Sequence, residues 1–242
     1  MWHIKKIDPA DLVVNTQYSA FVGAGGKTSL IEYLAGKVVE RNKKTVITTT
    51  TKIYAREPYI LLTQNRGGND ATGNPIRAGK TIENGKLTAV TFDDICELEK
   101  TFDTVLIEAD GAKGKPLKYP APHEPVIPPF SGMVFVLAGL DSLFGQIKEK
   151  VFRWNILGEK WGLTGSEIIS PEIFSSFFTN EVLLKDIGNK PCAIVLNKYD
   201  VFMQKKVLFH VAGEIIKRTG VERVIISSLA FRIFYEIRYF SP

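Results

Sequence analysis

The sequence has only two cysteines, Cys96 and Cys192, and they lie far apart in the chain. This excludes a disulfide framework and a C-x-x-C metal site, and it suits the reducing cytoplasm. The first residues lack the apolar core of a secretory signal peptide. The longest apolar runs, such as the one from Val134 to Leu140, are far too short to span a bilayer. We therefore expect a cytoplasmic protein that has no membrane partner.

The sequence also lacks any long run of one charge, because no run of basic residues exceeds two, although the formal net charge is +5. A basic stripe or base-stacking platform for a nucleic acid is therefore not evident, so we expect no nucleic-acid partner. The positive excess would still attract anionic ligands. The 242 residues, 45% of them hydrophobic, fit one large α/β domain or two small ones. Since no internal repeat or interdomain linker is evident, we expect a single domain over 1–242.

What the sequence does contain is a glycine-rich loop between an apolar strand and an amphipathic helix. Ala20-Phe21-Val22 precedes the loop, and a helix is expected over 28–41. Such a loop presents backbone N–H groups to an anion at a helix N-terminus, and its glycines let a phosphate approach closely. Lys27 would reach the terminal phosphates, and the hydroxyl of Thr28 would bind Mg²⁺. The expected phosphate-binding residues are Gly23, Ala24, Gly25, Gly26, Lys27, Thr28 and Ser29.

The match of this loop to known phosphate-binding loops is incomplete. In G-x-x-x-x-G-K-[ST] the first glycine falls on Phe21. In the variant K-G-G-x-G-K-T of metal-chaperone GTPases, the first lysine falls on Val22 and the second glycine on Ala24. The alternative is a plain glycine turn between a strand and a helix.

The segment from Phe102 to Gly111 is expected to be a buried strand that ends in two acids, Glu108 and Asp110. Alternation along a strand would point both side chains the same way. In P-loop enzymes an acid at this strand end holds Mg²⁺, directly or through water, and helps to position the attacking group. Both acids are therefore candidate metal ligands and catalytic residues. The D-x-x-G pattern of G proteins is absent, although Glu108-x-x-Gly111 is its acidic analogue, and an ordinary charged strand end is the alternative.

Asn197-Lys198-Tyr199-Asp200 follows the apolar run Cys192–Leu196 and matches N-K-x-D, the guanine-reading motif of P-loop GTPases. The carboxylate of Asp200 would accept hydrogen bonds from N1–H and the exocyclic amine of guanine, a two-point contact that adenine cannot make. The stem of Lys198 would cover the base, and Asn197 would brace the loop. Ser227-Ser228-Leu229 is a weak match to a second base-contacting loop. The alternative is a polar turn in which Asp200 caps the next helix.

Two further loops are candidates for the site. Thr48 to Ile53 is rich in hydroxyl groups and lies at the end of a strand expected over 45–49, so a threonine there could complete the Mg²⁺ shell. A β-branched strand with a solvated end explains the hydroxyl-rich composition of this segment equally well. The proline- and lysine-rich segment 112–125 is expected to lack regular structure, and such loops are usually functional. Lys113, a catalytic candidate, or Lys115 could reach a phosphate from it, and the role of His123 stays open.

Together these elements predict an α/β protein with a P-loop NTPase-like three-layer sandwich, in which helices flank a mostly parallel sheet. We expect an insertion over 63–90, which joins a surface loop over 63–79 to a hairpin over 80–90 with Asn84-Gly85 at its tip. A mostly helical insertion is expected over 141–188, with Ser170 as the N-cap of one helix. The tail 230–240 should dock on the core as a helix, or else serve a partner or dimer interface. Other expected elements are strands at 59–62, 133–139 and 224–226 and helices at 92–100 and 205–217.

The chain resembles the YqeC family, accessory proteins of selenium-dependent molybdenum hydroxylases. The resemblance implies a P-loop GTPase-like protein that uses Mg²⁺ and GTP or ATP and serves a molybdenum hydroxylase or its cofactor-biosynthesis proteins. The family tends to carry His-Arg where this chain has Phe152-Arg153-Trp154, which leaves Arg153 as a candidate arginine for transition-state charge. The resemblance rests on the glycine loop and on Thr48–Ile53, Glu108–Lys118, His123–Pro128, Gly139–Asp141 and Leu196–Asp200.

Three hypotheses for function follow. The first is a Mg²⁺-dependent nucleotide-binding accessory protein, GTP-binding or GTP-hydrolysing, that takes part in the maturation of such a hydroxylase or its cofactor. The second is a small-molecule kinase or nucleotide transferase that acts on an anionic substrate. The third is a nucleotide-binding module without chemistry. The sequence leaves open whether the protein is an enzyme and whether it forms a homodimer.

Overall fold

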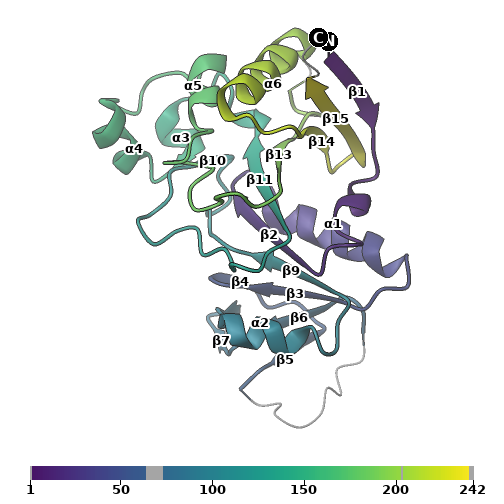
Figure 1. Ribbon diagram of the computed structural model, residues 1–242. Helices are drawn as coiled ribbons and strands as arrows, with labels where there is room; N and C mark the ends of the chain where they lie inside the picture. Colours follow the sequence, from purple (N-terminus) through teal and green to yellow (C-terminus); the bar gives the residue numbers. More distant parts are fainter. Residues whose placement is uncertain (1, 64–72, 203, 240–242) are drawn as a thin grey trace.

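The computed structural model describes residues 2–63, 73–202 and 204–239. In this part of the chain, ten strands form one large sheet (Figure 1). The strand order is β1-β15-β14-β13-β11-β2-β9-β3-β6-β5. All neighbours from β14 to β5 are parallel, whereas β15 is antiparallel to β14 and to β1. The predicted mostly parallel α/β sheet is confirmed. Its strands are β1 (Trp2–Lys6), β2 (Tyr18–Gly23), β3 (Thr45–Thr49), β5 (Tyr59–Leu61), β6 (Ile76–Gly79), β9 (Thr104–Glu108), β11 (Met133–Gly139), β13 (Cys192–Asn197), β14 (Val224–Ser228) and β15 (Ile233–Tyr239).

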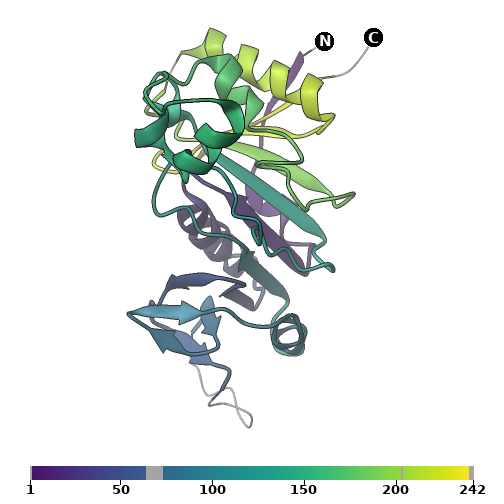
Figure 2. The same cartoon turned by 90° about the vertical axis from the view of Figure 1, so that its left-hand side faces the viewer.

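Helices cover both faces of this sheet because its central strands are apolar on both sides. In β9, Leu106 packs in one cluster with α1 (Lys27–Val39), while Val105 and Ile107 pack on the opposite face with α2 (Phe92–Leu98). That opposite face also carries α4 (Trp154–Trp161), α5 (Pro171–Ser176) and α6 (Lys205–Thr219). Figure 2 shows α2 near one end of the molecule and the helices α4, α5 and α6 at the other. Three layers result, as the sequence predicts.

Two small sheets flank the large one. β4 (Lys52–Tyr54) pairs with β8 (Lys86–Thr88), which pairs with β7 (Ile82–Glu83), all antiparallel. The predicted hairpin tip Asn84-Gly85 is confirmed, with φ of 49° and 72° at its two residues. β10 (Leu117–Lys118) pairs in parallel with β12 (Val151–Phe152). In the part of the chain that the structure describes, no helix is long and apolar enough to cross a membrane.

Several predicted elements are wrong or incomplete. Within the loop predicted over 63–79, residues 64–72 lie outside the described part, and the loop ends in β6, whose Ile76 and Ala78 are buried in the core. The segment 112–125 contains the short strand β10. The segment 141–188 holds the one-turn helix α3 (Ile147–Lys150), α4 and α5, with turns between them, rather than long helices. The predicted N-cap is confirmed, because the side chain of Ser170 accepts from the N–H of Ile173.

The tail is a strand and not a helix. Its sequence from Ile233 to Tyr239 is rich in β-branched and aromatic residues, which favour a strand when neighbouring strands are available. β15 has such neighbours on both sides, since it pairs with β14 and with the unpredicted N-terminal strand β1. Phe234 and Ile237 are buried on it. The expected docking on the core is thus correct, and the expected conformation is not.

Candidate functional site

The glycine loop lies at the carboxyl end of β2, near the centre of the sheet. On one side of β2 lie β9 and β3, and on the other side lie β11 and β13, so the chain order reverses at this strand. Ligands of open parallel sheets bind in the crevice at such a reversal, outside the carboxyl ends of the strands. The predicted helix α1 begins immediately after the loop, at Lys27. The sheet and the helix therefore place the loop where a ligand site is expected.

The loop is held in a conformation that only glycine adopts easily. Gly23, Gly25 and Gly26 have φ of +91°, +84° and +120°. A Cβ atom on Gly25 would lie 2.3 Å from the backbone nitrogen of Gly139. Ala24 is fully buried without a positive φ, and its N–H donates to the carbonyl of Leu137 at 2.9 Å. Its methyl group therefore fits where the variant K-G-G-x-G-K-T has its second glycine.

Lys27 is folded back over this loop. Its ammonium donates to the carbonyl of Gly23 at 2.6 Å and lies 3.0 Å from Oδ1 of Asp110. The other carboxylate oxygen of Asp110 accepts from the N–H of Gly23 at 2.9 Å. Both side chains are only 3% exposed. The strand-end acid and the loop lysine thus meet, with Asp110 bound to the loop backbone.

Glu108 and Thr28 form the second contact between the acidic strand end and the loop. The hydroxyl of Thr28 donates to Oε2 of Glu108 at 2.8 Å. Burial raises the pKa of Glu108, although the charge of Lys27 and the hydrogen bond from Thr28 oppose the rise. Among the described residues, no group of three or more His, Cys, Asp or Glu side chains could hold a metal ion. A Mg²⁺ ion here would therefore depend on Thr28, Glu108, phosphate oxygens and water, which suits an ion that keeps several waters.

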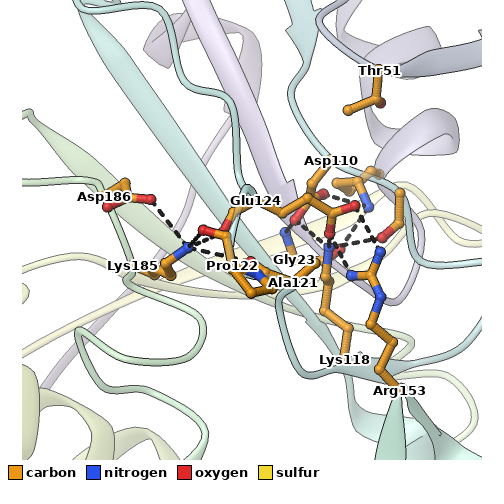
Figure 3. A network of polar contacts seen from close by, with 12 residues as sticks. Gly23, Thr51, Asp110, Lys118, Ala121, Pro122, Glu124, Arg153, Lys185 and Asp186 are labelled. Carbon is orange, nitrogen blue, oxygen red and sulfur yellow. Dashed lines mark hydrogen bonds and ion pairs between the residues drawn. The ribbon is translucent and has the colours of Figure 1, made fainter. Parts of the chain in front are cut away.

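A buried ionic network extends from Asp110 away from the loop (Figure 3). Lys118 is 1% exposed, and its ammonium donates to Asp110 at 2.9 Å, to Glu124 at 2.6 Å and to the carbonyl of Gly111 at 2.8 Å. Arg153 donates from both terminal nitrogens to Glu124, at 2.6 and 2.9 Å. Burial alone would raise the pKa of Glu124, but the hydrogen bonds and charges of Arg153 and Lys118 lower it to about 2. The predicted candidate Arg153 is therefore paired with a carboxylate.

Sequence reasoning missed Lys118 and Glu124 as members of this network. Nothing in a loop of several lysines and prolines distinguishes the one lysine that is buried. Lys185, from the segment before β13, also holds this loop, because its ammonium donates to the carbonyls of Pro122 at 2.7 Å and Glu124 at 2.6 Å (Figure 3). Such contacts, more than sixty residues apart in sequence for Lys185, leave no local pattern.

The N-K-x-D segment lies beside the glycine loop. Asn197 is 3% exposed and donates from its amide to the carbonyl of Gly25 at 2.9 Å, which is the bracing contact that the sequence predicts. The hydroxyl of Ser227 donates to Oδ1 of Asn197 at 3.0 Å, and that of Ser228 donates to Asp200 at 2.6 Å. Lys198 pairs with Asp141 at 2.7 Å. The alternative that Asp200 caps the next helix is wrong, because the N-cap residue of α6 is Gln204.

These elements border a cleft of about 900 Å³. Lys113 lies in its wall with its ammonium 5.6 Å from the ring centroid of Phe152, and not on either acid. Thr48 donates to the carbonyl of Ala78 inside the core, so only the later residues of the threonine run face the cleft. Of the predicted site residues, those lining the cleft are Gly25, Gly26, Lys27, Thr28, Ser29, Glu108, Lys113 and Lys198, and the further candidates Lys115, His123 and Arg153 line it too. Those not lining it are Gly23, Ala24, Asp110, Asn197 and Asp200.

Known proteins resemble this chain over more than half of its length. Residues 19–155 match the YqeC protein family, so the match runs from β2 to the start of α4. One relative is an uncharacterized protein YqeC of Escherichia coli strain K12. It is 32% identical over 180 residues, which cover 65% of this chain and 68% of the relative. No solved structure matches the chain.

Proposed function

The chain belongs to the YqeC family, and on that premise we propose that it binds a nucleoside triphosphate with Mg²⁺ at the glycine loop. Lys27 and the N–H groups in the first turn of α1 would neutralise phosphate charge. Thr28 with Glu108 would hold Mg²⁺, and Asp110 would position Lys27. Bound nucleotide, and its hydrolysis, would drive a step in the maturation of a selenium-dependent molybdenum hydroxylase or its cofactor.

The observation that carries this proposal is the buried contact of Lys27 with Asp110 and Gly23. Asp110 holds the ammonium of Lys27 at 3.0 Å, at the first position of α1, and so fixes this lysine beside the cleft. Seven basic and two acidic side chains line that cleft, so its field attracts anions. A triphosphate would replace the carbonyl of Gly23 as the acceptor for Lys27.

A preference for GTP over ATP is supported by the contacts of the N-K-x-D segment. Asn197 connects the segment to the glycine loop through its hydrogen bond to Gly25, and the hydroxyl of Ser228 donates to one oxygen of Asp200. A carboxylate held in this way keeps its other oxygen, and a lone pair on the first, for the two donors of guanine. The role in hydroxylase maturation is supported by the family membership alone.

The test is isothermal titration calorimetry with non-hydrolysable GTP and ATP analogues in the presence of Mg²⁺. We expect the wild type to bind the GTP analogue more tightly. Lys27→Ala should weaken both analogues by about 10- to 100-fold, the worth of one charge-assisted contact. Asp200→Ala should remove the preference for GTP and keep the binding of ATP.

Lys37→Ala is the matched control, because Lys37 lies on the same helix and pairs at the surface with Glu40. It should bind both analogues as the wild type does. A wild-type protein that binds neither analogue would exclude the proposed function. Equal loss of binding in both lysine variants would indicate a general charge effect and not a site at Lys27.

A further inference from the structure

The turn between β14 and β15 lies beside the N-K-x-D segment and the glycine loop. It covers residues 229–232, and β14 is the parallel neighbour of β13, so the turn and the N-K-x-D segment leave the sheet at the same edge (Figure 1). The two segments are in contact, because the N–H of Tyr199 donates to the carbonyl of Ser227 at 2.9 Å. A Cβ atom on Gly26 would lie 4.0 Å from the side chain of Leu229, so the turn reaches the glycine loop as well.

Phe231 lies in this turn with its ring in solvent. The side chain is 68% exposed, which is the highest value among the large apolar side chains in the described part of the chain. Its N–H donates to the hydroxyl of Ser228 at 3.3 Å, and the same hydroxyl donates to Asp200 at 2.6 Å. Val201, the next most exposed of these apolar side chains, follows Asp200 directly. The two apolar side chains that are most open to solvent are therefore both beside the carboxylate that would read guanine.

A base bound at Asp200 would have little cover from the cleft. Asp200 does not line the cleft, whereas Lys198 does. The ammonium group of Lys198 is held by Asp141 at 2.7 Å, and its stem would cover one face of the base. Hydrogen bonds to the edge of the base contribute little where water can replace them. An apolar surface over the second face of the base would exclude that water.

We propose that the ring of Phe231 stacks on the base of the bound nucleotide, on the face opposite Lys198. The proposal rests on the proposed function, because phosphates at the glycine loop would place the base beside Asp200. Stacking on an aromatic ring tightens the binding of a base by about 5- to 150-fold and tolerates every base. Phe231 would therefore hold guanine and adenine alike, and Asp200 would select between them.

The size of the apolar surface favours a small ligand over a protein partner. A stable protein interface buries about 1,200 Å² or more, which two exposed side chains on a turn do not supply. One aromatic ring does match the flat face of a base.

The test compares three ligands calorimetrically in the presence of Mg²⁺. They are the non-hydrolysable GTP analogue, the ATP analogue and inorganic tripolyphosphate, which has no base. Phe231→Ala should weaken both nucleotide analogues by a similar factor of at least about five, and it should bind tripolyphosphate within about twofold of the wild type. Phe231→Trp should restore the affinity for both nucleotides, because an indole ring also stacks on bases.

Phe92→Ala is the matched control, because Phe92 is also exposed and lies on α2, which is low in Figure 1 where β14 is high. It should bind all three ligands as the wild type does. Unchanged nucleotide affinity in Phe231→Ala, a loss confined to GTP, or an equal loss for tripolyphosphate would overturn the stacking and leave the proposed function intact. A wild type that binds tripolyphosphate and neither nucleotide would exclude a base site and leave only an anion site at the glycine loop. A wild type that binds none of the three would exclude the proposed function and the stacking with it.

Discussion

The ammonium group of Lys118 lies 2.9 Å from Oδ2 of Asp110, the oxygen that also accepts from the N–H of Gly23. Both side chains are almost completely buried. The same ammonium group contacts Glu124 at 2.6 Å, so Lys118 joins the glycine loop to the segment that carries Glu124. A displacement of Lys118 therefore changes the position of Asp110 and, through it, of the loop.

Replacing Lys118 with methionine should lower the free energy of unfolding by about 3 kcal/mol, because two buried carboxylates then each lose one of their two cationic partners. Urea unfolding followed by circular dichroism measures the change. Lys100→Met, which removes an exposed ion pair, should cost no more than about 1 kcal/mol. If the two variants had the same free energy of unfolding, the buried contacts of Lys118 would not stabilise the fold.

Stability should fall in acid because of Glu124. The partners of this residue lower its folded-state pKa from 4.5 to about 2. An acid with a lowered pKa contributes stability that is complete above its unfolded-state pKa and is lost as the pH falls through the folded one. The contribution of about 3 kcal/mol should therefore decline between pH 4.5 and 2. Unfolding of the wild type and Glu124→Gln is compared across this range, and their difference should shrink as the pH falls. A difference that is constant with pH would contradict the assignment.

The parts of the fold that could be predicted are those with a local pattern. The glycine loop between an apolar strand and α1 is correct, as are the acid-ended strand β9 and the strand before Asn197. In each case apolar periodicity identifies the element and the polar residues mark its end. Parallel strands have their carboxyl ends at the same edge of the sheet. The residues that follow β2, β9 and β13 therefore meet there, and Lys27, Asp110 and Asn197 all contact the glycine loop.

What could not be predicted depends on partners distant in sequence. Arg153 and Glu124 are twenty-nine residues apart, and the strand β15 forms because β1 and β14 flank it. Tertiary context decides the conformation of such segments, whatever their own propensity. The same reason explains why buried Lys118 could not be distinguished from its exposed neighbour Lys113.

Glu108→Gln should stabilise the protein and weaken its ligand. Burial raises the pKa of Glu108, so the ionised carboxylate is a cost that is complete above its folded-state pKa and absent below its unfolded-state pKa. A glutamine keeps the acceptor for Thr28 without the charge. We expect a higher melting temperature at pH 7 and at least about tenfold weaker Mg²⁺-dependent nucleotide binding. Thermal unfolding and calorimetry on the same sample test both. A variant with unchanged affinity would exclude Glu108 from the metal site.

Two glycine substitutions of the same kind should have opposite effects. Gly25→Ala places a methyl group 2.3 Å from the backbone of Gly139 at a φ of +84°, so the loop must move, and we expect a loss of about 2 kcal/mol or more. Gly36 lies inside α1 with nothing within 4 Å of its added Cβ, so Gly36→Ala should stabilise by up to about 1 kcal/mol. Denaturant unfolding of both variants provides the comparison. Two variants that lose stability equally would show that the loop is not strained.

Ser228→Ala should change nucleotide preference. The hydroxyl of Ser228 holds Asp200 at 2.6 Å, and without it the carboxylate gains rotamers that do not face a base. Reading two donors at once requires both oxygens to be fixed, so GTP should lose more affinity than ATP, by about five- to tenfold. Competition calorimetry between the two analogues measures the ratio. Ser227→Ala is the informative comparison, because Ser227 holds Asn197, which donates to the glycine loop, and its loss should weaken both nucleotides alike. If Ser228→Ala also weakened both alike, Asp200 would support the loop and would not read the base.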